Sequence, residues 1–218
     1  MDYAHRQRHA RELASRARKQ LKIGGITTSE IEVRDIVKAW VAISIAFAIV
    51  LSSHALSDFY TKFIIASLTV GIGFLLHEMG HKIVAQRYGC FAEFRSFDNM
   101  LILAIAMSFF GFIFAAPGAV MISGHVSKRR NGMISAAGPV VNLALAVVFL
   151  ALVFMELPAL PGSIAYYGFM INSWLALFNM IPFWLFDGYK ILKWSKLVYG
   201  CIVAAALALM LLQNFIRL

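Results

Sequence analysis

Long apolar runs separated by short polar segments make up most of the chain after residue 38. A helix rises about 1.5 Å per residue, so about 20 apolar residues cross a hydrocarbon core about 30 Å thick. Five runs approach or exceed that length. They predict membrane-spanning helices at residues 39–56, 62–88, 133–155, 164–186 and 197–215.

The stretch at residues 97–120 is also apolar, but it does not fit a further crossing. It ends in Pro117-Gly118, a pair that stops a helix. A single crossing there would place the basic residues 128–130 on the opposite side of the membrane from the other basic clusters. We therefore predict a re-entrant or interface-lying element, followed by an extended, strand-like segment at residues 119–124. The whole pattern predicts an all-α polytopic membrane protein with about five transmembrane helices.

Composition supports this class and excludes a large soluble module, because 61% of the 218 residues are hydrophobic. The net charge of +9 could suggest a nucleic-acid partner. The basic residues flank the apolar runs, however, where they set orientation, so we expect the lipid bilayer and no nucleic acid. Cys90 and Cys201 are isolated, and neither a disulfide nor a cysteine zinc site is predicted.

Residues 1–37 form a polar, basic segment that we place in the cytoplasm by the positive-inside rule. Its function is either contact with anionic lipid or a partner, or only that of a solvated tail that sets topology. The first apolar run follows this long segment without a small-residue cleavage site, so we interpret it as a retained span rather than a signal peptide. Residues 38–218 are predicted to form one membrane-embedded domain of a multi-pass cell-membrane protein.

Three polar side chains interrupt the second apolar run, namely His77, Glu78 and His81. Residues four apart lie on one face of a helix, so the two imidazoles can hold a single Zn²⁺. A carboxylate that is not a ligand but touches the metal-bound water can act as general base and acid. The alternative is a pair of structural histidines beside a glutamate. Because ionisable groups within a membrane span are costly and usually functional, the metal site is favoured.

Asp187 is the candidate for a third ligand. Between residue 101 and the C-terminus only Glu156 and Asp187 are acidic. The predicted crossings bring Asp187 to the cytoplasmic side, near His77 and His81, where it can complete a site with an open fourth position. Pro182 should loosen the preceding helix and let this segment turn toward the metal. The alternative is a helix stop at Asp187-Gly188, with Asp187 paired to Lys190.

Taken in order, these motifs resemble the site-2 protease family of intramembrane zinc metalloproteases. The resemblance covers about residues 62–193 and includes an apolar GPVVN motif between the two sites just described. The matching motifs are HEMGH at residues 77–81, GPVVN at residues 138–142, and NMIP at residues 179–182 followed by Asp187-Gly188.

The resemblance implies one Zn²⁺ per chain, held by His77, His81 and Asp187, with Glu78 as catalytic acid and base. It further implies that Asn179 holds the substrate backbone or the oxyanion, and that Asn142 has a weaker supporting role. The strand-like segment at residues 119–124 resembles the family's membrane-associated strand, which is thought to pair with an unwound substrate. The segment before Gly138 is longer and more apolar than in commoner members, and neither a PDZ nor a CBS module is expected.

The implied activity is hydrolysis of peptide bonds in or near transmembrane segments of membrane protein substrates, at the cytoplasmic side. One alternative is a non-catalytic zinc-binding membrane protein or a metal transporter, although the polar residues gather at one depth rather than along a path. A second is a zinc hydrolase whose third ligand is Glu93 or Glu156. The natural substrate, the regulation and the oligomeric state remain open.

Overall fold

The computed structural model describes residues 20–23, 25–52, 56–113 and 116–216, and most of these are helical. Residues 1–19 of the predicted basic segment lie outside the described residues. The helices are α2 Glu30–Leu51, α3 Phe59–Ala66, α4 Ile72–Arg87, α5 Asp98–Ser108, α6 Lys128–Val153, α7 Ala159–Phe178, α8 Asp187–Trp194 and α9 Lys196–Leu212. The strands are β1 Gln20–Ile23, β2 Ile26–Ser29, β3 Phe91–Ser96 and β4 Gly118–Ser123.

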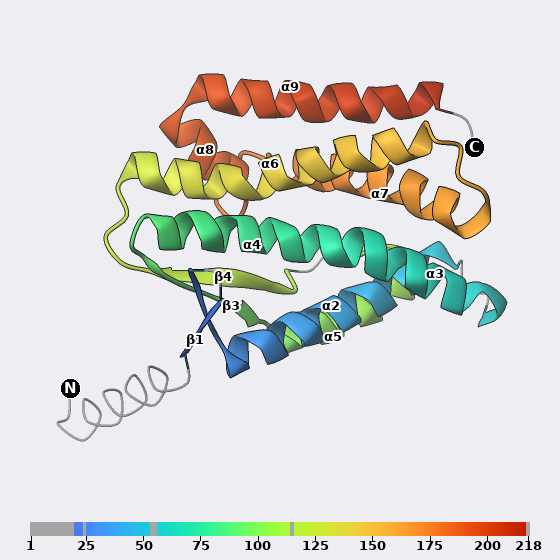
Figure 1. Ribbon diagram of the computed structural model, residues 1–218, viewed down its shortest axis with the longest axis horizontal. Helices are drawn as coiled ribbons and strands as arrows, with labels where there is room; N and C mark the ends of the chain where they lie inside the picture. Colours follow the sequence, from blue (N-terminus) through green and yellow to red (C-terminus); the bar gives the residue numbers. More distant parts are fainter. Residues whose placement is uncertain (1–19, 24, 53–55, 114–115, 217–218) are drawn as a thin grey trace.

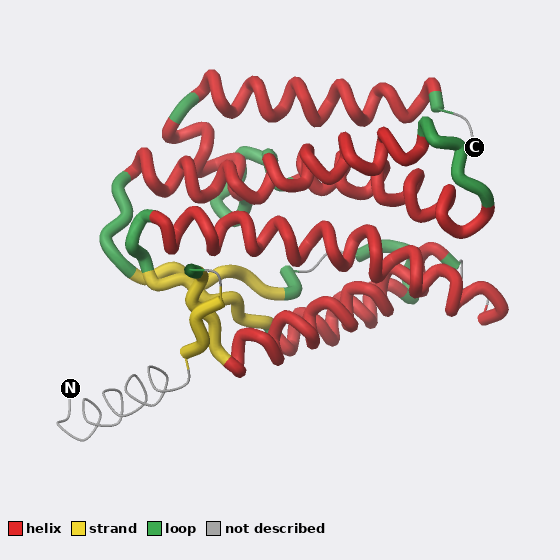
Figure 2. The backbone as a smooth tube through the Cα atoms, viewed as in Figure 1, coloured by secondary structure: helices red, strands yellow, loops and turns green. Residues whose placement is uncertain are grey.

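The long helices form a bundle in which successive members alternate in direction (Figure 1). Helix α9 lies along one side of the bundle beside α7 and α6, α4 lies in the middle, and α2 with α5 lies on the other side. The strands gather at one end, close to the C-terminal half of α4 (Figure 2). That end also holds the start of α6, the end of α7 and all of α8.

Within the described ranges, three helices are long and apolar enough to cross a membrane, which indicates a membrane protein. They are Phe59–Arg87, Lys128–Val153 and Lys196–Phe215. These confirm the second, third and fifth predicted spans as long apolar helices. The first and fourth predicted spans correspond to α2 and α7, which do not meet the same criterion. Helix α2 begins nine residues earlier than predicted and includes five charged side chains in its first half.

The second apolar helix contains a π-helical turn, Ser67–Gly71, between α3 and α4. The indole N–H of Trp40 on α2 donates to the Ser67 carbonyl at 3.0 Å. Gly71 makes this contact possible, because a Cβ there would lie 2.8 Å from the Trp40 ring. The helix therefore continues from Phe59 to Arg87 with one widened turn against α2.

The end of the fourth predicted span was wrong, because α7 ends at Phe178 and not at residue 186. Pro182 lies four residues later, has no N–H to donate, and its ring would clash with the Phe178 carbonyl in a continuing helix. A bent segment follows until α8 begins at Asp187. Helix α8 itself was not predicted.

The predicted strand at residues 119–124 is confirmed as β4, which pairs antiparallel with β3. Strand β3 was not predicted. Ser96 pairs with Gly118, so the chain leaves this sheet through α5 and returns to the same point. With 11 residues, α5 is too short to cross a bilayer, and it packs beside α2.

The N-terminal hairpin of β1 and β2 was also not predicted. Ser29 accepts a hydrogen bond from the Glu32 N–H and so begins α2. The side-chain amide of Gln86, at the end of α4, bonds both backbone groups of Thr27. It also donates to the Ala92 carbonyl of β3. Gln86 thus attaches both sheets to the end of α4.

A buried ion pair joins α2, α4 and β3. The Lys82 ammonium contacts the Glu32 carboxylate at 2.6 Å, and both side chains are almost inaccessible to solvent. The same carboxylate accepts hydrogen bonds from the Thr28 hydroxyl and the Phe94 N–H. Since an unpaired buried charge is very unfavourable, these bonds fix the relative positions of the three elements.

Candidate metal centre

His77 and His81 lie one turn apart on the inner face of α4, and both are buried. Their Nε2 atoms are 3.0 Å from one another. The predicted spacing therefore produces two imidazoles that face a common point.

Asp187, the first residue of α8, reaches the same point from the other part of the chain. Its Oδ2 lies 3.3 Å from His77 Nε2 and 3.0 Å from His81 Nε2. Its carboxylate is also 3.8 Å from the half-exposed Lys190, the predicted alternative partner, but such a contact contributes little. Among the described residues, His77, His81 and Asp187 form the group that could hold a metal ion, with ligand atoms all within 4.8 Å of one another.

The segment before Asp187 is held by a close backbone contact. The Gly188 N–H donates to the Asn179 carbonyl at 2.8 Å. A Cβ on residue 188 would lie only 2.2 Å from the Met180 carbonyl oxygen, so the approach requires glycine. Burial alone would raise the pKa of the Asp187 carboxyl, but positive charge on the side of His81 and His77 lowers it below its usual value. A cation at the centre would act in the same direction and keep the carboxylate available as a ligand.

Hydrogen bonds on the far side of each ring determine which nitrogen faces the centre. His81 Nδ1 lies 2.8 Å from the Ile134 carbonyl oxygen, which can only accept. His77 Nδ1 lies 2.6 Å from Asn142 Oδ1, and the Asn142 amide nitrogen is directed away, toward Gly73 O and Asn172 Oδ1. Both Nδ1 atoms therefore carry the proton, and both Nε2 atoms present lone pairs.

This donor set fits zinc. Two lone-pair nitrogens and a carboxylate oxygen lie within 3.0–3.3 Å of one another, an arrangement that a cation between them would stabilise. Ligands about 2.0–2.1 Å from one tetrahedral ion are separated by about 3.3 Å, and zinc prefers N and O ligands of this kind. The three residues are thus positioned to bind Zn²⁺.

Helix α6 leaves room for the ion. A Cβ on Gly138 would lie 2.5 Å from the Nε2 atoms of both His77 and His81. On α4, a Cβ on Gly80 would lie 3.1 Å from the Ala137 carbonyl oxygen. These glycines permit close contact between α6 and the metal-binding face of α4.

Glu78 follows His77 on α4 and is buried, as the three ligands are. Its Oε2 accepts a hydrogen bond from the Val120 N–H of β4 at 3.0 Å. Val120 is paired with Phe94 of β3. The Phe94 N–H points away from β4 and donates to Glu32, so these two residues form a pair without hydrogen bonds to each other. The N–H of Val120 is thus on the edge of β4 that faces the site.

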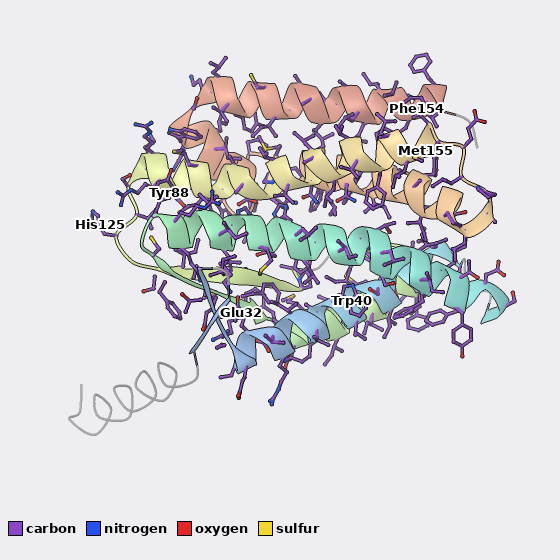
Figure 3. The ribbon with its side chains drawn as sticks, in the orientation of Figure 1. Glu32, Trp40, Tyr88, His125, Phe154 and Met155 are labelled. Carbon is purple, nitrogen blue, oxygen red and sulfur yellow. The ribbon has the colours of Figure 1, made fainter. Side chains whose placement is uncertain are left out.

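The remaining candidates have other surroundings. The Asn179 side chain donates to the Leu175 carbonyl at 2.9 Å, and its role toward a substrate stays a prediction. Glu93 is paired with Arg95. Figure 3 shows Tyr88 and His125 at the site end of the bundle and Met155 at the opposite end, so Glu156, the next residue, does not reach the ligands. His125 is exposed on a loop.

Sequence reasoning missed Asn172 of α7, which is fully buried and bonded to Asn142. It also missed the backbone groups of Ile134 and Val120. Backbone partners leave no sequence signal, and a single asparagine in an apolar helix has no spacing that identifies its partner.

The buried ligand group and the long apolar helices suit a zinc metalloprotease of a membrane, and the names of similar known proteins agree. The chain is 42% identical over 159 residues to MJ0611 of Methanocaldococcus jannaschii, which is provisionally named a zinc metalloprotease; the match covers 70% of this chain and 82% of that protein. It is 28% identical to the zinc metalloprotease MJ0392 of the same organism, over 56% of this chain and 31% of that protein. It is 34% identical to Rip2 of Mycolicibacterium smegmatis, another provisionally named zinc metalloprotease, over 54% of this chain and 52% of that protein.

The chain belongs to the site-2 protease-like family of zinc metalloproteases. No family model matches it, and no solved structure matches it significantly.

Proposed function

We propose that the protein is an intramembrane zinc endopeptidase that hydrolyses peptide bonds in or near the transmembrane segments of membrane protein substrates. The observation that carries this proposal is the meeting of His77, His81 and Asp187 beside Glu78 within a bundle of long apolar helices. A buried ligand set of this kind, with a carboxylate that is not a ligand, suits metal-assisted hydrolysis.

Five crossings are part of the proposal. Helices α2, α3–α4, α6, α7 and α9 alternate in direction along the bundle, which supports an odd number of passes (Figure 1). His77 and His81 lie ten and six residues, or about 15 and 9 Å of helix, before the end of α4 at Arg87. Basic residues follow at the same end, at positions 128–130 and 190–196. By the positive-inside rule, that end and the N-terminus are cytoplasmic, and water reaches the site from there.

The chemistry follows from the positions of the side chains. Bound Zn²⁺ would supply a Lewis acid that makes water acidic near neutral pH and polarises the scissile carbonyl. Glu78 accepts the proton of the attacking water and later donates it to the leaving amine. The Val120 N–H holds Glu78 Oε2, so that the other carboxylate oxygen remains available for this transfer. Asn179 is the proposed donor to the substrate backbone or the oxyanion.

Strand β4 is the proposed binding edge for the substrate. A helical amide is hydrogen-bonded and covered, so the scissile segment has to unwind and bind in an extended form. The edge of β4 opposite β3 faces α4 and Glu78. Addition of a substrate strand at this edge would bring its backbone beside the three ligands. The same proposal gives Asn142 its supporting role through His77.

The test is cleavage of a single-span substrate by the purified protein in liposomes. The substrate carries helix-breaking residues near its cytoplasmic end, and the same sequence is offered in parallel as a soluble peptide. We expect zinc-dependent cleavage of the membrane substrate, lost with a chelator and restored by Zn²⁺. Cleavage of the soluble peptide alone, or none of either, would contradict the proposal.

Glu78→Gln is the matched variant for this assay. It keeps the shape of the side chain and an acceptor for the Val120 N–H, so zinc content should be unchanged. Loss of the general base should lower the cleavage rate by about 10²–10⁴-fold. Glu93→Gln, which changes a buried carboxylate paired with Arg95, is the control. Wild-type turnover by Glu78→Gln would remove Glu78 from catalysis.

The alternative of a metal transporter gains no support from the comparisons.

A further inference from the structure

We propose that Asn172 is a positioning residue for the zinc ligand His77 and acts through Asn142. The inference rests on the zinc site described above but not on the identity of the substrate. Asn172 lies on α7, a helix that contributes no ligand, and its side chain is completely buried. It joins α7 to Asn142 on α6, which in turn contacts His77 on α4.

The donor and the acceptor of each hydrogen bond in this series follow from the Gly168 carbonyl, at the end of the series farthest from His77. The Gly168 carbonyl can only accept, so Asn172 Nδ2 faces it, at 2.9 Å. Asn172 Oδ1 therefore faces Asn142, and it accepts from Asn142 Nδ2 at 3.0 Å. Asn142 Oδ1 is left to face His77 Nδ1, at 2.6 Å. The proton of His77 consequently lies on Nδ1 and the lone pair on Nε2, where a metal ligand needs it.

Tight packing supports this arrangement. A Cβ on Gly73 would lie 2.5 Å from Asn172 Oδ1, so the amide fits against bare backbone of α4. Asn142 Nδ2 also donates to the Gly73 carbonyl, at the longer distance of 3.2 Å. Asn172 is thus the nearer of the two acceptors that fix the orientation of the Asn142 amide.

The two histidines differ in this respect. His81 Nδ1 is bonded to a backbone carbonyl, whose orientation no side-chain substitution reverses. His77 depends on a side-chain amide, which can turn over. If the Asn142 amide turned, its NH₂ group would face His77 Nδ1, and the imidazole proton would move to Nε2. Nε2 would then point a proton at the metal position, so Asn172 protects one ligand of the three.

The experiment measures metal binding rather than cleavage. Zinc affinity is determined by competition with a chelator, and Co²⁺ is substituted to record its visible absorption, which reports the ligand set. Asn172→Leu removes the acceptor while keeping the volume, and should weaken zinc binding by about tenfold and alter the Co²⁺ spectrum. Asn172→Asp retains an acceptor for Asn142 Nδ2 and should restore most of the affinity.

Ser173→Ala is the matched control, because Ser173 is also fully buried on α7 but, among the described residues, its hydroxyl donates to the Phe169 carbonyl of the same helix alone. Its zinc affinity and Co²⁺ spectrum should equal those of the wild type. If Asn172→Leu does not fold, Asn172→Ser, whose hydroxyl is too short to reach Asn142, replaces it. Wild-type affinity and spectrum in the folded variant that lacks the acceptor would overturn the inference. Failure of the proposed protease function would instead appear as zinc-loaded protein without cleavage.

Discussion

At the scale of single residues, each ligand of the metal centre is oriented by a different kind of partner. A backbone carbonyl orients His81, a side-chain amide orients His77, and a glycine beside the next residue allows Asp187 to approach. Replacement of outer partners of this kind typically lowers metal affinity by about 10–100-fold.

Replacement of Asp187 by Ala should weaken zinc binding by more than about a hundredfold. The reason is that removal of a ligand lowers metal affinity more than removal of an outer partner does. Metal analysis after dialysis measures this loss. Asp98→Ala, which removes an exposed carboxylate bonded to Lys38, should leave the zinc content unchanged. Full zinc occupancy in Asp187→Ala would show that the carboxylate is not a ligand.

A second change at this scale fills the space that the ion needs. In Gly138→Ala, the new methyl group would lie 2.5 Å from both His77 Nε2 and His81 Nε2. Zinc binding should be lost although alanine is the better helix former. Gly200→Ala on α9, where a Cβ meets nothing within 4 Å, is the control. Normal zinc binding by Gly138→Ala would mean that the ion lies elsewhere.

Much of the candidate site could be predicted. Its residues either have a recognisable local spacing or belong to a residue type that is rare in their part of the chain. The spacing of His77 and His81 places both rings on one face of a helix, and Asp187 is one of two acidic residues in the second half of the chain. Asn172 could not be predicted, since its partner is 30 residues away on another helix.

At the scale of elements, features with a clear local pattern in the sequence were again predictable, and features without one were not. Long apolar helices were predictable from hydrophobic length, and β4 was predictable because Pro117-Gly118 stops the preceding apolar stretch. Strand β3 was not, because its charged residues Glu93 and Arg95 conceal any apolar alternation. The early end of α7 was missed because the residues after Phe178 remain apolar.

The ion pair between α2 and α4 gives a prediction at this scale. Lys82→Met leaves the Glu32 carboxylate buried without its partner and should lower the free energy of unfolding by about 3–5 kcal/mol. Denaturation in detergent micelles measures this change. The double variant Lys82→Met/Glu32→Gln should recover much of the stability, since no charge then remains buried. Asp98→Asn, which changes the exposed partner of Lys38 and leaves the Lys38–Asp35 pair intact, should have little effect. Equal stability of Lys82→Met and wild type would show that Glu32 is hydrated or neutral.

At the scale of the whole molecule, the arrangement separates two ends. The hairpin, the β3–β4 sheet, the metal centre and the basic residues 128–130 lie toward one end, and the connection between α6 and α7 lies at the other (Figures 1 and 3). An enzyme built in this way would admit water and release products at one surface of the bilayer only.

Site-directed labelling tests this orientation. In a Cys90→Ser/Cys201→Ser background, His125→Cys should react with an impermeant thiol reagent only from the cytoplasmic side. Met155→Cys should react only from the exterior, because the two residues lie at opposite ends of the bundle (Figure 3). Labelling of both from the same side would contradict the proposed five crossings. A cytosolic protein and an exterior loop of known topology serve as controls for membrane integrity.

The π-helical turn at Ser67–Gly71 affects how this chain can change in length. Such a turn amounts to one extra residue in an α-helix, and one residue rotates everything beyond it by about 100°. A single-codon deletion at Leu68 would let the turn relax to regular α-helix, at the cost of the Trp40 contact. A deletion two turns later, between Gly73 and His77, has no widened turn to absorb it. It would swing both imidazoles away from α6, so tolerance of deletions along this helix should change abruptly at Gly71.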